Sequence, residues 1–220
     1  MKKFLLGLVA LLATASAFAA TTYTYTGPAY TLVTGTYTTS MQITGSFTTA
    51  APLAPNLSDV DITGQVTSYS FSDGVNTYTN SDINARIFAF KVSTDASGTI
   101  TYWGIVLKLW ESGTSPHSTG DKISFMSTML STVWGANDRA YDEITCITVG
   151  DSSYSGVSDV CIVEAAGSWL GSATVNATGS WTSQTAATAT SIPTLSEWGM
   201  IILSSLLALG TVLVMRRQRL

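Results

Sequence analysis

The sequence predicts an all-β protein: a single β-sandwich-like domain of short antiparallel strands, flanked by an N-terminal signal peptide and a C-terminal transmembrane helix. Three features of the 220 residues lead to this prediction. The middle of the chain alternates Thr and Ser with apolar residues, and Gly-rich turns separate the alternating segments. An apolar stretch stands near each end. Only 11% of the residues are charged, under half of the usual ~25%.

The first residues, 1–19, have the pattern of a secretory signal peptide. A basic start precedes an apolar run over residues 4–13, which is shorter than the ~20 residues that a membrane span needs. Ala17 and Ala19 put small side chains where signal peptidase reads them, so we predict that the mature chain begins at Ala20. The Sec export machinery and signal peptidase are therefore expected partners. An uncleaved N-terminal anchor is the alternative.

Strand signals fill residues 20–181, the predicted domain. The expected strands lie in residues 21–50, then in 66–71 and 75–79 as one hairpin, in 86–94 and 100–110 as a second hairpin, and in 123–133, 144–149, 160–163 and 172–181. Residues 100–110 carry apolar side chains on both faces, which predicts a central strand that is covered on both sides.

The two cysteines, Cys146 and Cys161, predict a disulfide, because an even number of cysteines in an exported chain usually forms bonds. The Gly- and Ser-rich segment 150–156 lies between two short apolar runs and reads as the turn of a hairpin that brings the sulfurs together. Closing this loop is expected to contribute about 3 kcal/mol to stability. A metal-binding or nucleophilic thiol pair is the weaker alternative, since there is no CxxC spacing and no nearby His.

The C-terminal part begins with residues 182–191, whose Ala, Thr and Ser predict a flexible linker. Residues 198–215 are eighteen residues without a charge, and as a helix they would be ~27 Å long, close to the ~30 Å thickness of the hydrocarbon layer. Arg216, Arg217 and Arg219 follow and are expected to stay in the cytoplasm. This orientation places the domain in the periplasm.

A short motif precedes the apolar segment and is made of Ile192, Pro193, Thr194, Leu195, Trp198 and Gly199. The motif (192–199), the helix (198–215) and the basic tail (216–220) together resemble the IPTL-CTERM sorting signal of Gram-negative bacteria, a relative of the PEP-CTERM type. Pro193 disfavours helix in the residue before it, so the motif would be extended at the membrane surface.

This resemblance implies processing by an exosortase, a membrane transpeptidase that cleaves near the motif and passes the protein outward. It implies a transient anchor in the inner membrane, followed by release to the cell surface or the extracellular matrix, where exopolysaccharide is a candidate partner. Through residues 37–39, 45–48, 71–74 and 92–98 with Trp103, the domain also resembles a β ectodomain type that recurs on such proteins, and this resemblance implies no activity.

Charge and residue types argue against several functions. Residues 21–195 hold thirteen acidic and five basic residues, so the net charge of −8 excludes a nucleic-acid-binding footprint. His117 is the single histidine and stands in a polar loop, and the chain has no GxSxG elbow, so we predict no enzyme. Carboxylates are plentiful for glycoside hydrolysis, but most of them, such as Asp73, Asp95 and Asp151, are expected in turns.

Two ligand-binding hypotheses stay open. We predict no cofactor and no bound metal, but Asn137 and Asp138 with Asp142 and Glu143, or Asp59 with Asp61, could supply oxygen ligands to Ca²⁺. Trp169 and Trp181, flanked by Gly and Ser, could form an exposed platform for a sugar ring, although large aromatic residues usually fill a core. The sequence therefore favours a non-catalytic structural or interaction protein, with a carbohydrate-binding module as the alternative and a secreted hydrolase in third place.

Overall fold

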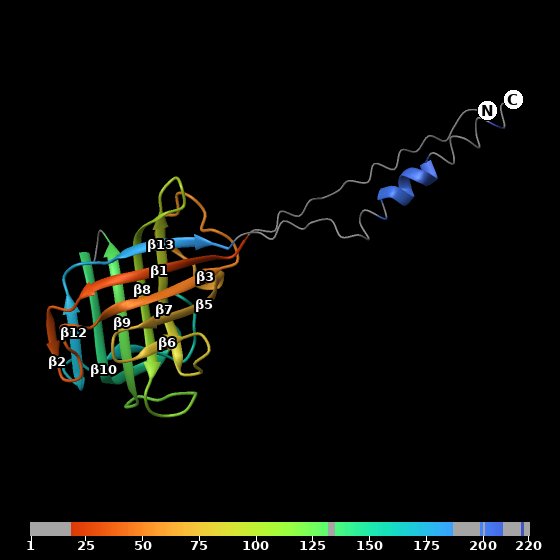
Figure 1. Ribbon diagram of the computed structural model, residues 1–220. Helices are drawn as coiled ribbons and strands as arrows, with labels where there is room; N and C mark the ends of the chain where they lie inside the picture. The colour runs from red at the N-terminus through yellow and green to blue at the C-terminus, as the bar shows by residue number, and fades with distance from the viewer. Residues whose placement is uncertain (1–18, 132–134, 187–198, 200, 209–216, 218–220) are drawn as a thin grey trace. The chain divides into compact units, whose positions relative to one another are not determined.

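Alternation of buried and exposed side chains sorts the strands into two antiparallel sheets. The computed structural model describes residues 19–131, 135–186, 199, 201–208 and 217, and the chain divides into two units, Met1–Ala186 and Ala187–Leu220. The small sheet has the order β13 (Ser180–Thr185), β1 (Thr21–Ala29), β3 (Gln42–Thr49), β5 (Val66–Ser72) and β6 (Thr77–Thr79) (Figure 1).

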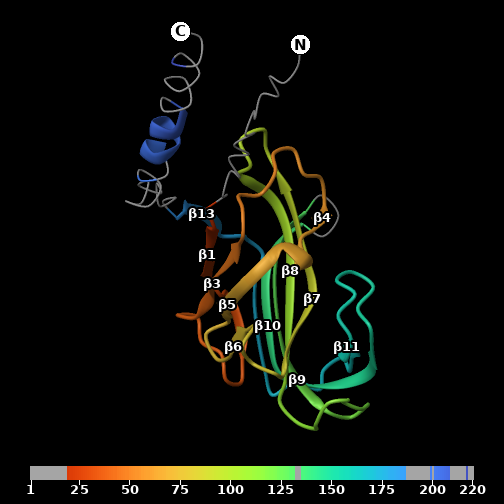
Figure 2. The ribbon, with the colours of Figure 1, turned by 90° about the vertical axis from the view of Figure 1, so that its right-hand side faces the viewer.

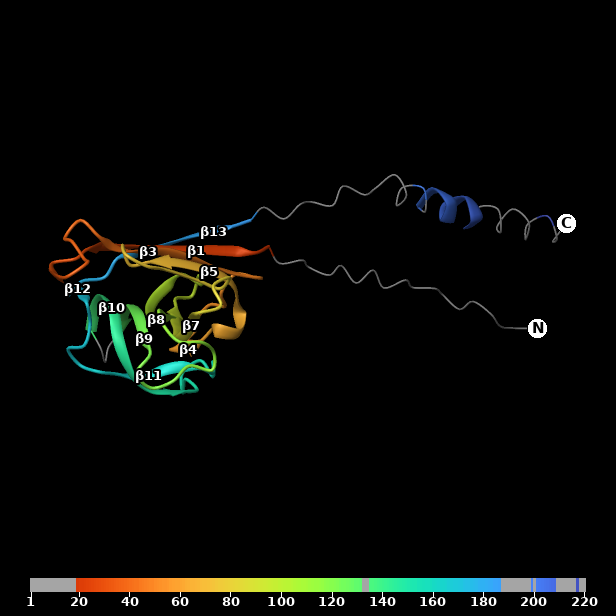
Figure 3. The ribbon, with the colours of Figure 1, turned by 90° about the horizontal axis from the view of Figure 1, so that it is seen from below.

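The large sheet has the order β2 (Leu32–Thr34), β12 (Gly171–Val175), β10 (Gly135–Gly150), β9 (Lys122–Ser131), β8 (Ile100–Trp110), β7 (Ala85–Thr94) and β4 (Val60–Asp61). β11 (Val160–Glu164) pairs only with β10, and a 3-10 helix, η1 (Thr63–Gln65), precedes β5. Neither sheet closes on itself, and they lie face to face as in a sandwich (Figure 3). The predicted all-β, sandwich-like fold is thus confirmed for the described part of the chain.

The core lies between the two sheets and is unusually rich in aromatic rings. Phe47 of the small sheet is completely buried; its ring stacks on Tyr23 at 4.8 Å and meets the edges of Phe90 at 4.9 Å and Trp181 at 5.5 Å. Such offset and edge-on ring pairs are favourable beyond the apolar area that they bury. Trp181 therefore helps to fill the core, and the hypothesis of an exposed Trp169–Trp181 pair is wrong.

The two predicted hairpins are present. β5 pairs with β6, and β7 pairs with β8 across the turn that follows Thr94. β8 lies between β7 and β9, with Ile105 and Leu107 buried in the main core and Val106 and Trp110 buried on the opposite face. The prediction of a central strand covered on both sides is confirmed.

Strand lengths differ from the prediction. The expected strand 144–149 is only the end of β10, which has sixteen residues. β10 can be this long because it bends: its register with β9 shifts between Tyr141 and Ile144, and Glu143 has a positive φ of 51°. Before the bend β10 pairs with β9 and β12. After it, Ile144 and Thr145 still pair with β9, and residues 146–150 pair with β11, which lies outside the sandwich (Figure 2).

The expected strand 172–181 is also two strands. β12 ends in the large sheet, the chain crosses to the small sheet, and β13 begins at Ser180. Gly179 lies at this crossing, where a Cβ atom would come within 1.8 Å of the Thr26 carbonyl oxygen. The crossing therefore requires glycine, a close approach that strand patterning does not reveal.

The ends of the domain also differ from the prediction. β13 extends to Thr185, so four residues of the predicted linker 182–191 belong to the sheet, because β1 offers them backbone hydrogen bonds. In the second unit, residues 201–208 are helical. None of the helices in the described ranges is long and apolar enough to cross a membrane. Most of the predicted span 198–215 and residues 1–18 of the predicted signal peptide lie outside the described residues.

Truncation of the central core ring tests this packing. We expect Phe47→Ala to lower the free energy of unfolding of the full chain by about 4 kcal/mol, because it leaves a cavity among three aromatic rings. Urea denaturation monitored by circular dichroism measures the change. The exposed Ser68→Ala on β5 is the control and should stay within about 0.5 kcal/mol. Equal stability of the two variants would contradict the assigned core.

Candidate functional site

The sorting tail is the first candidate site, and the structure describes only part of it. Among the predicted motif and orientation residues, Gly199 and Arg217 lie within the described ranges; Ile192, Pro193, Thr194, Leu195, Trp198, Arg216 and Arg219 lie outside them. The helix over residues 201–208 exposes its apolar side chains, with Leu207 62% exposed. The hydroxyls of Ser204 and Ser205 donate to the Ile201 carbonyl oxygen, so both side chains are hydrogen-bonded within this helix.

The two ends of the domain are hydrogen-bonded to each other. The Ala186 N–H donates to the carbonyl oxygen of Ala20 at 2.9 Å, and the Thr21 and Thr185 hydroxyls lie 3.1 Å apart. Ala20 is the predicted first residue of the mature chain; Ala19 is described and Ala17 is not. The chain therefore enters and leaves the domain at neighbouring positions on the β1–β13 edge.

The predicted disulfide between Cys146 and Cys161 is present, and both residues are completely buried. It joins β10 to β11 behind a loop that folds back onto β7. There the Ser152 hydroxyl donates to the Phe88 carbonyl oxygen, and the Ser155 hydroxyl donates to that of Ile87 at 2.7 Å. The disulfide thus links the two strands of the hairpin, and hydrogen bonds hold the hairpin's loop against β7.

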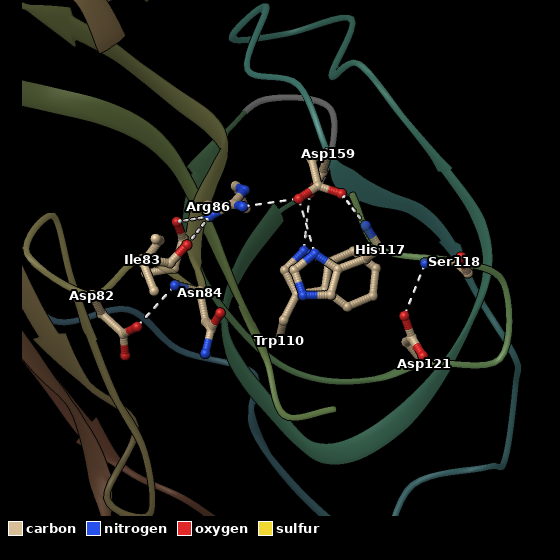
Figure 4. A network of polar contacts seen from close by, with 10 residues as sticks. Asp82, Ile83, Asn84, Arg86, Trp110, His117, Ser118, Asp121 and Asp159 are labelled. Carbon is tan, nitrogen blue, oxygen red and sulfur yellow. Dashed lines mark hydrogen bonds and ion pairs between the residues drawn. The ribbon is translucent and has the colours of Figure 1, made fainter. Parts of the chain in front are cut away.

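A second set of contacts between loops and the large sheet surrounds His117 (Figure 4). The Asp159 carboxylate accepts hydrogen bonds from the His117 backbone N–H at 2.7 Å and from Arg86 at 2.9 Å, and its Oδ2 lies 2.9 Å from His117 Nδ1. The Trp110 ring stacks on the His117 ring at 4.2 Å, and its indole N–H donates to the Asp159 carbonyl oxygen. This His117–Asp159 cluster ties the loop after β8, the disulfide hairpin and β7 together.

Charge within the cluster is concentrated on Asp159. Partial burial acts to raise the pKa of its carboxyl group, but the hydrogen bonds from the His117 backbone and ring, Arg86 and Ser115 outweigh this effect and hold the pKa well below its usual range. The other ring nitrogen of His117, Nε2, is buried and has no hydrogen-bond partner among the described residues. In a Ser-His-Asp triad, a serine hydroxyl would be hydrogen-bonded to this Nε2 atom. The cluster has the geometry of a structural tie.

Two other acidic groups lie buried between the sheets. Asp138 accepts the Tyr25 hydroxyl on both carboxylate oxygens, at 2.9 and 3.0 Å, and burial raises its pKa to about 6, against the opposing effect of hydrogen bonds from Thr128 and Tyr25. Asp73 accepts the Tyr37 and Tyr78 hydroxyls, and burial raises its pKa as well. These tyrosine–carboxylate pairs satisfy polar groups within the aromatic core.

Most of the carboxylates considered for Ca²⁺ are engaged in other contacts. Asp138 and Asp142 point into the sandwich, where Asp142 accepts hydrogen bonds from Thr36, Asn76 and Ser124, whereas Glu143 is exposed at the bend. Asp59 forms an ion pair with Lys91, and Asp61 accepts from the Thr63 N–H. Within the ranges that the structure describes, no group of three or more His, Cys, Asp or Glu residues could hold a metal ion.

The comparisons with known proteins identify the C-terminal signal. Residues 190–219 match the family model described as the IPTL-CTERM motif. The chain therefore carries an exosortase-type sorting signal, which implies an exported protein that an exosortase-type system sorts to the cell surface. The comparison with curated proteins and the comparison with solved structures gave no match.

The His117–Asp159 cluster makes stability depend on acid pH. Because the pKa of Asp159 is lowered in the folded state, its stabilising effect is present above pH ~4 and is lost as the pH falls further. We expect Asp159→Asn to lower the free energy of unfolding by about 2 kcal/mol at pH 7 and by progressively less as the pH falls below ~4. Urea titrations at several pH values measure this. The exposed Asp151→Asn in the same hairpin serves as the control.

Asp138 has the opposite pH dependence. Its pKa is raised to about 6, so the folded state loses stability as the pH rises from about 4 to about 6, by roughly 3 kcal/mol. We expect Asp138→Asn to abolish this loss, whereas Asp151→Asn retains it. The readout is the slope of unfolding free energy against pH. An unchanged slope in Asp138→Asn would mean that another group binds this proton.

Proposed function

We propose that this protein is a non-enzymatic component of the cell surface or the extracellular matrix, whose β-sandwich has a structural or binding role. The observation that carries the proposal is the IPTL-CTERM signal at residues 190–219, which follows directly after a disulfide-bonded β domain. The disulfide fits an oxidising location outside the cytoplasm. The full pathway would use the Sec machinery, signal peptidase, a transient inner-membrane anchor and an exosortase.

The geometry of the acid–base groups supports a role without catalysis. The His117 ring is held between Trp110 and Asp159, and its free nitrogen is buried without a partner among the described residues. Asp73 and Asp138, whose raised pKa values could suit a general acid, are completely buried and occupied by tyrosine hydroxyls. A hydrolase needs such groups within reach of a substrate.

A carbohydrate-binding module is the second candidate. Rings of Phe125, Tyr141 and Trp169 form a row on the outer face of the large sheet, with centroids 5.6 Å and 5.0 Å apart, and all three are only partly buried. The structure thus offers an aromatic surface other than the Trp169–Trp181 pair. Aromatic faces attract the weakly positive C–H groups of a sugar ring.

Processing of the tail tests the delivery part of the proposal. In cells that contain an exosortase, we expect a mature protein that begins at Ala20 and ends near Leu195, and in cells without one the tail is retained. We expect Pro193→Ala to reduce the processed form about tenfold, because the motif can then continue the helix that follows. Thr188→Ala, outside the motif, is the control. Mass spectrometry of surface and membrane fractions gives the result.

Two outcomes would refute the proposal. A tag placed after Leu220 that antibodies reach from outside intact cells would reverse the predicted orientation of the basic tail. Turnover of an ester or glycoside substrate by the purified full chain that is lost in His117→Ala would show catalysis, and would replace the proposed role.

A further inference from the structure

The outer face of the large sheet has two adjacent cross-strand rows of side chains that the sandwich core does not use. In the first row Phe125 of β9 pairs with Tyr141 of β10, which pairs with Ser172 of β12. In the second row Ser127 pairs with Arg139, which pairs with Thr174. Because alternate residues of a strand point to the same face, the two rows stand side by side, about 7 Å apart along β10. We call these six residues the outer-face site.

The opposite face of the same strands establishes which way these residues point. Ala140 and Ala173 are buried in the core between the sheets, and Asp138 bonds to Tyr25 of the small sheet. Arg139 and Tyr141 alternate with them and therefore face outward. The Phe125–Tyr141 ring contact and the further contact between Tyr141 and Trp169 confirm that these rings share one side. β9, β10 and β12 are neighbours in the sheet (Figure 3).

Arg139 is, with Lys122, one of two basic residues in the described domain that form no ion pair with a described carboxylate. Arg86, Lys91 and Lys108 of the domain form ion pairs with Asp159, Asp59 and Glu164. Arg139 is exposed and forms no ion pair with a described carboxylate, although the domain around it is strongly acidic. A guanidinium group with free donors recognises a carboxylate through two parallel hydrogen bonds. This site therefore presents an unpaired cation beside an aromatic row, in a domain whose net charge is negative; the other cation near the row, Lys108, lies 6.0 Å from the Phe125 ring centroid and is paired with Glu164.

The hydroxyl groups around Arg139 complete the site. Ser127 is 1% exposed and lies beneath the surface of the site, and its hydroxyl has no hydrogen-bond partner among the described residues. Ser172 lies at the other end, where its hydroxyl is 2.8 Å from that of Thr34 and both are open to solvent. Aromatic rings, a free guanidinium and several hydroxyls match a ligand that has apolar ring faces, carboxylates and many hydroxyl groups.

We propose that the outer-face site binds an acidic polysaccharide, with a uronic acid ring against Tyr141 and Phe125 and its carboxylate paired with Arg139. The proposal rests on the binding role under "Proposed function" and names the ligand class and the residues for it. A peptide with acidic side chains would satisfy Arg139 but would offer no ring faces to the aromatic row, so the site favours the sugar.

The test is a binding titration of the full chain in detergent with three probes: tetragalacturonate, a neutral tetrasaccharide and poly-glutamate. We expect binding of tetragalacturonate that weakens about tenfold in Arg139→Gln, since one charge-assisted contact is lost. Tyr141→Leu, which keeps an apolar side chain of similar bulk, should weaken it by a similar factor. Lys122→Gln, a basic residue whose ammonium group donates to Thr145, is the matched control and should change the affinity less than about twofold.

The outcomes separate this site from the proposed function. No binding of tetragalacturonate, equal binding in Arg139→Gln, or tighter binding of poly-glutamate overturns the outer-face site, and a retained thermal unfolding midpoint shows that each variant is folded. If the protein is still exported, processed and catalytically inert in those cases, the proposed function stands without this ligand. If processing fails while tetragalacturonate binds, the site stands and the delivery route is wrong.

Discussion

The bend of β10 is the feature on which most of this structure depends. Up to Asp142 the strand lies in the large sheet between β9 and β12; Ile144 and Thr145 still pair with β9, and from Cys146 onward the strand pairs with β11. Because side chains alternate along a strand, its first half places Asp138 in the core and Arg139 and Tyr141 on the outer face. Its second half carries Cys146 to Cys161. One strand thereby connects the core, the disulfide hairpin and the outer-face site.

Tyrosine hydroxyls supply the hydrogen bonds that two buried carboxylates in the sandwich need. The domain has few charged residues, yet Asp73 and Asp138 are completely buried between its sheets. Each accepts hydrogen bonds from tyrosines whose rings also fill the core. A buried carboxylate without partners would cost several kcal/mol, and the tyrosine hydroxyls offset this cost. Removal of either partner leaves the other buried without its hydrogen bond.

The sequence allowed much of the fold to be predicted, because local patterns carry it. Both hairpins, the central position of residues 100–110 and the disulfide follow from alternation, turn residues and an even cysteine count. The crossing at Gly179 and the extension of β13 to Thr185 could not be predicted in this way. In both cases the deciding contact comes from β1, more than 150 residues earlier in the chain, and composition alone reads such segments as a continuous strand or a linker.

The functional residues also fall into two groups: those that the sequence identifies and those that only the tertiary structure brings together. The sorting signal is a contiguous motif followed by an apolar run and arginines, so the sequence alone determined that this protein is exported and sorted, and the family comparison agrees. Only the tertiary structure decided that His117 is held by Asp159, that Trp181 belongs to the core and that Arg139 stands beside Tyr141 and Ser127 on one face. The sorting signal is a motif of consecutive residues, so the sequence alone reveals it. A binding face is assembled by strand register, and register is set by pairing between distant parts of the chain.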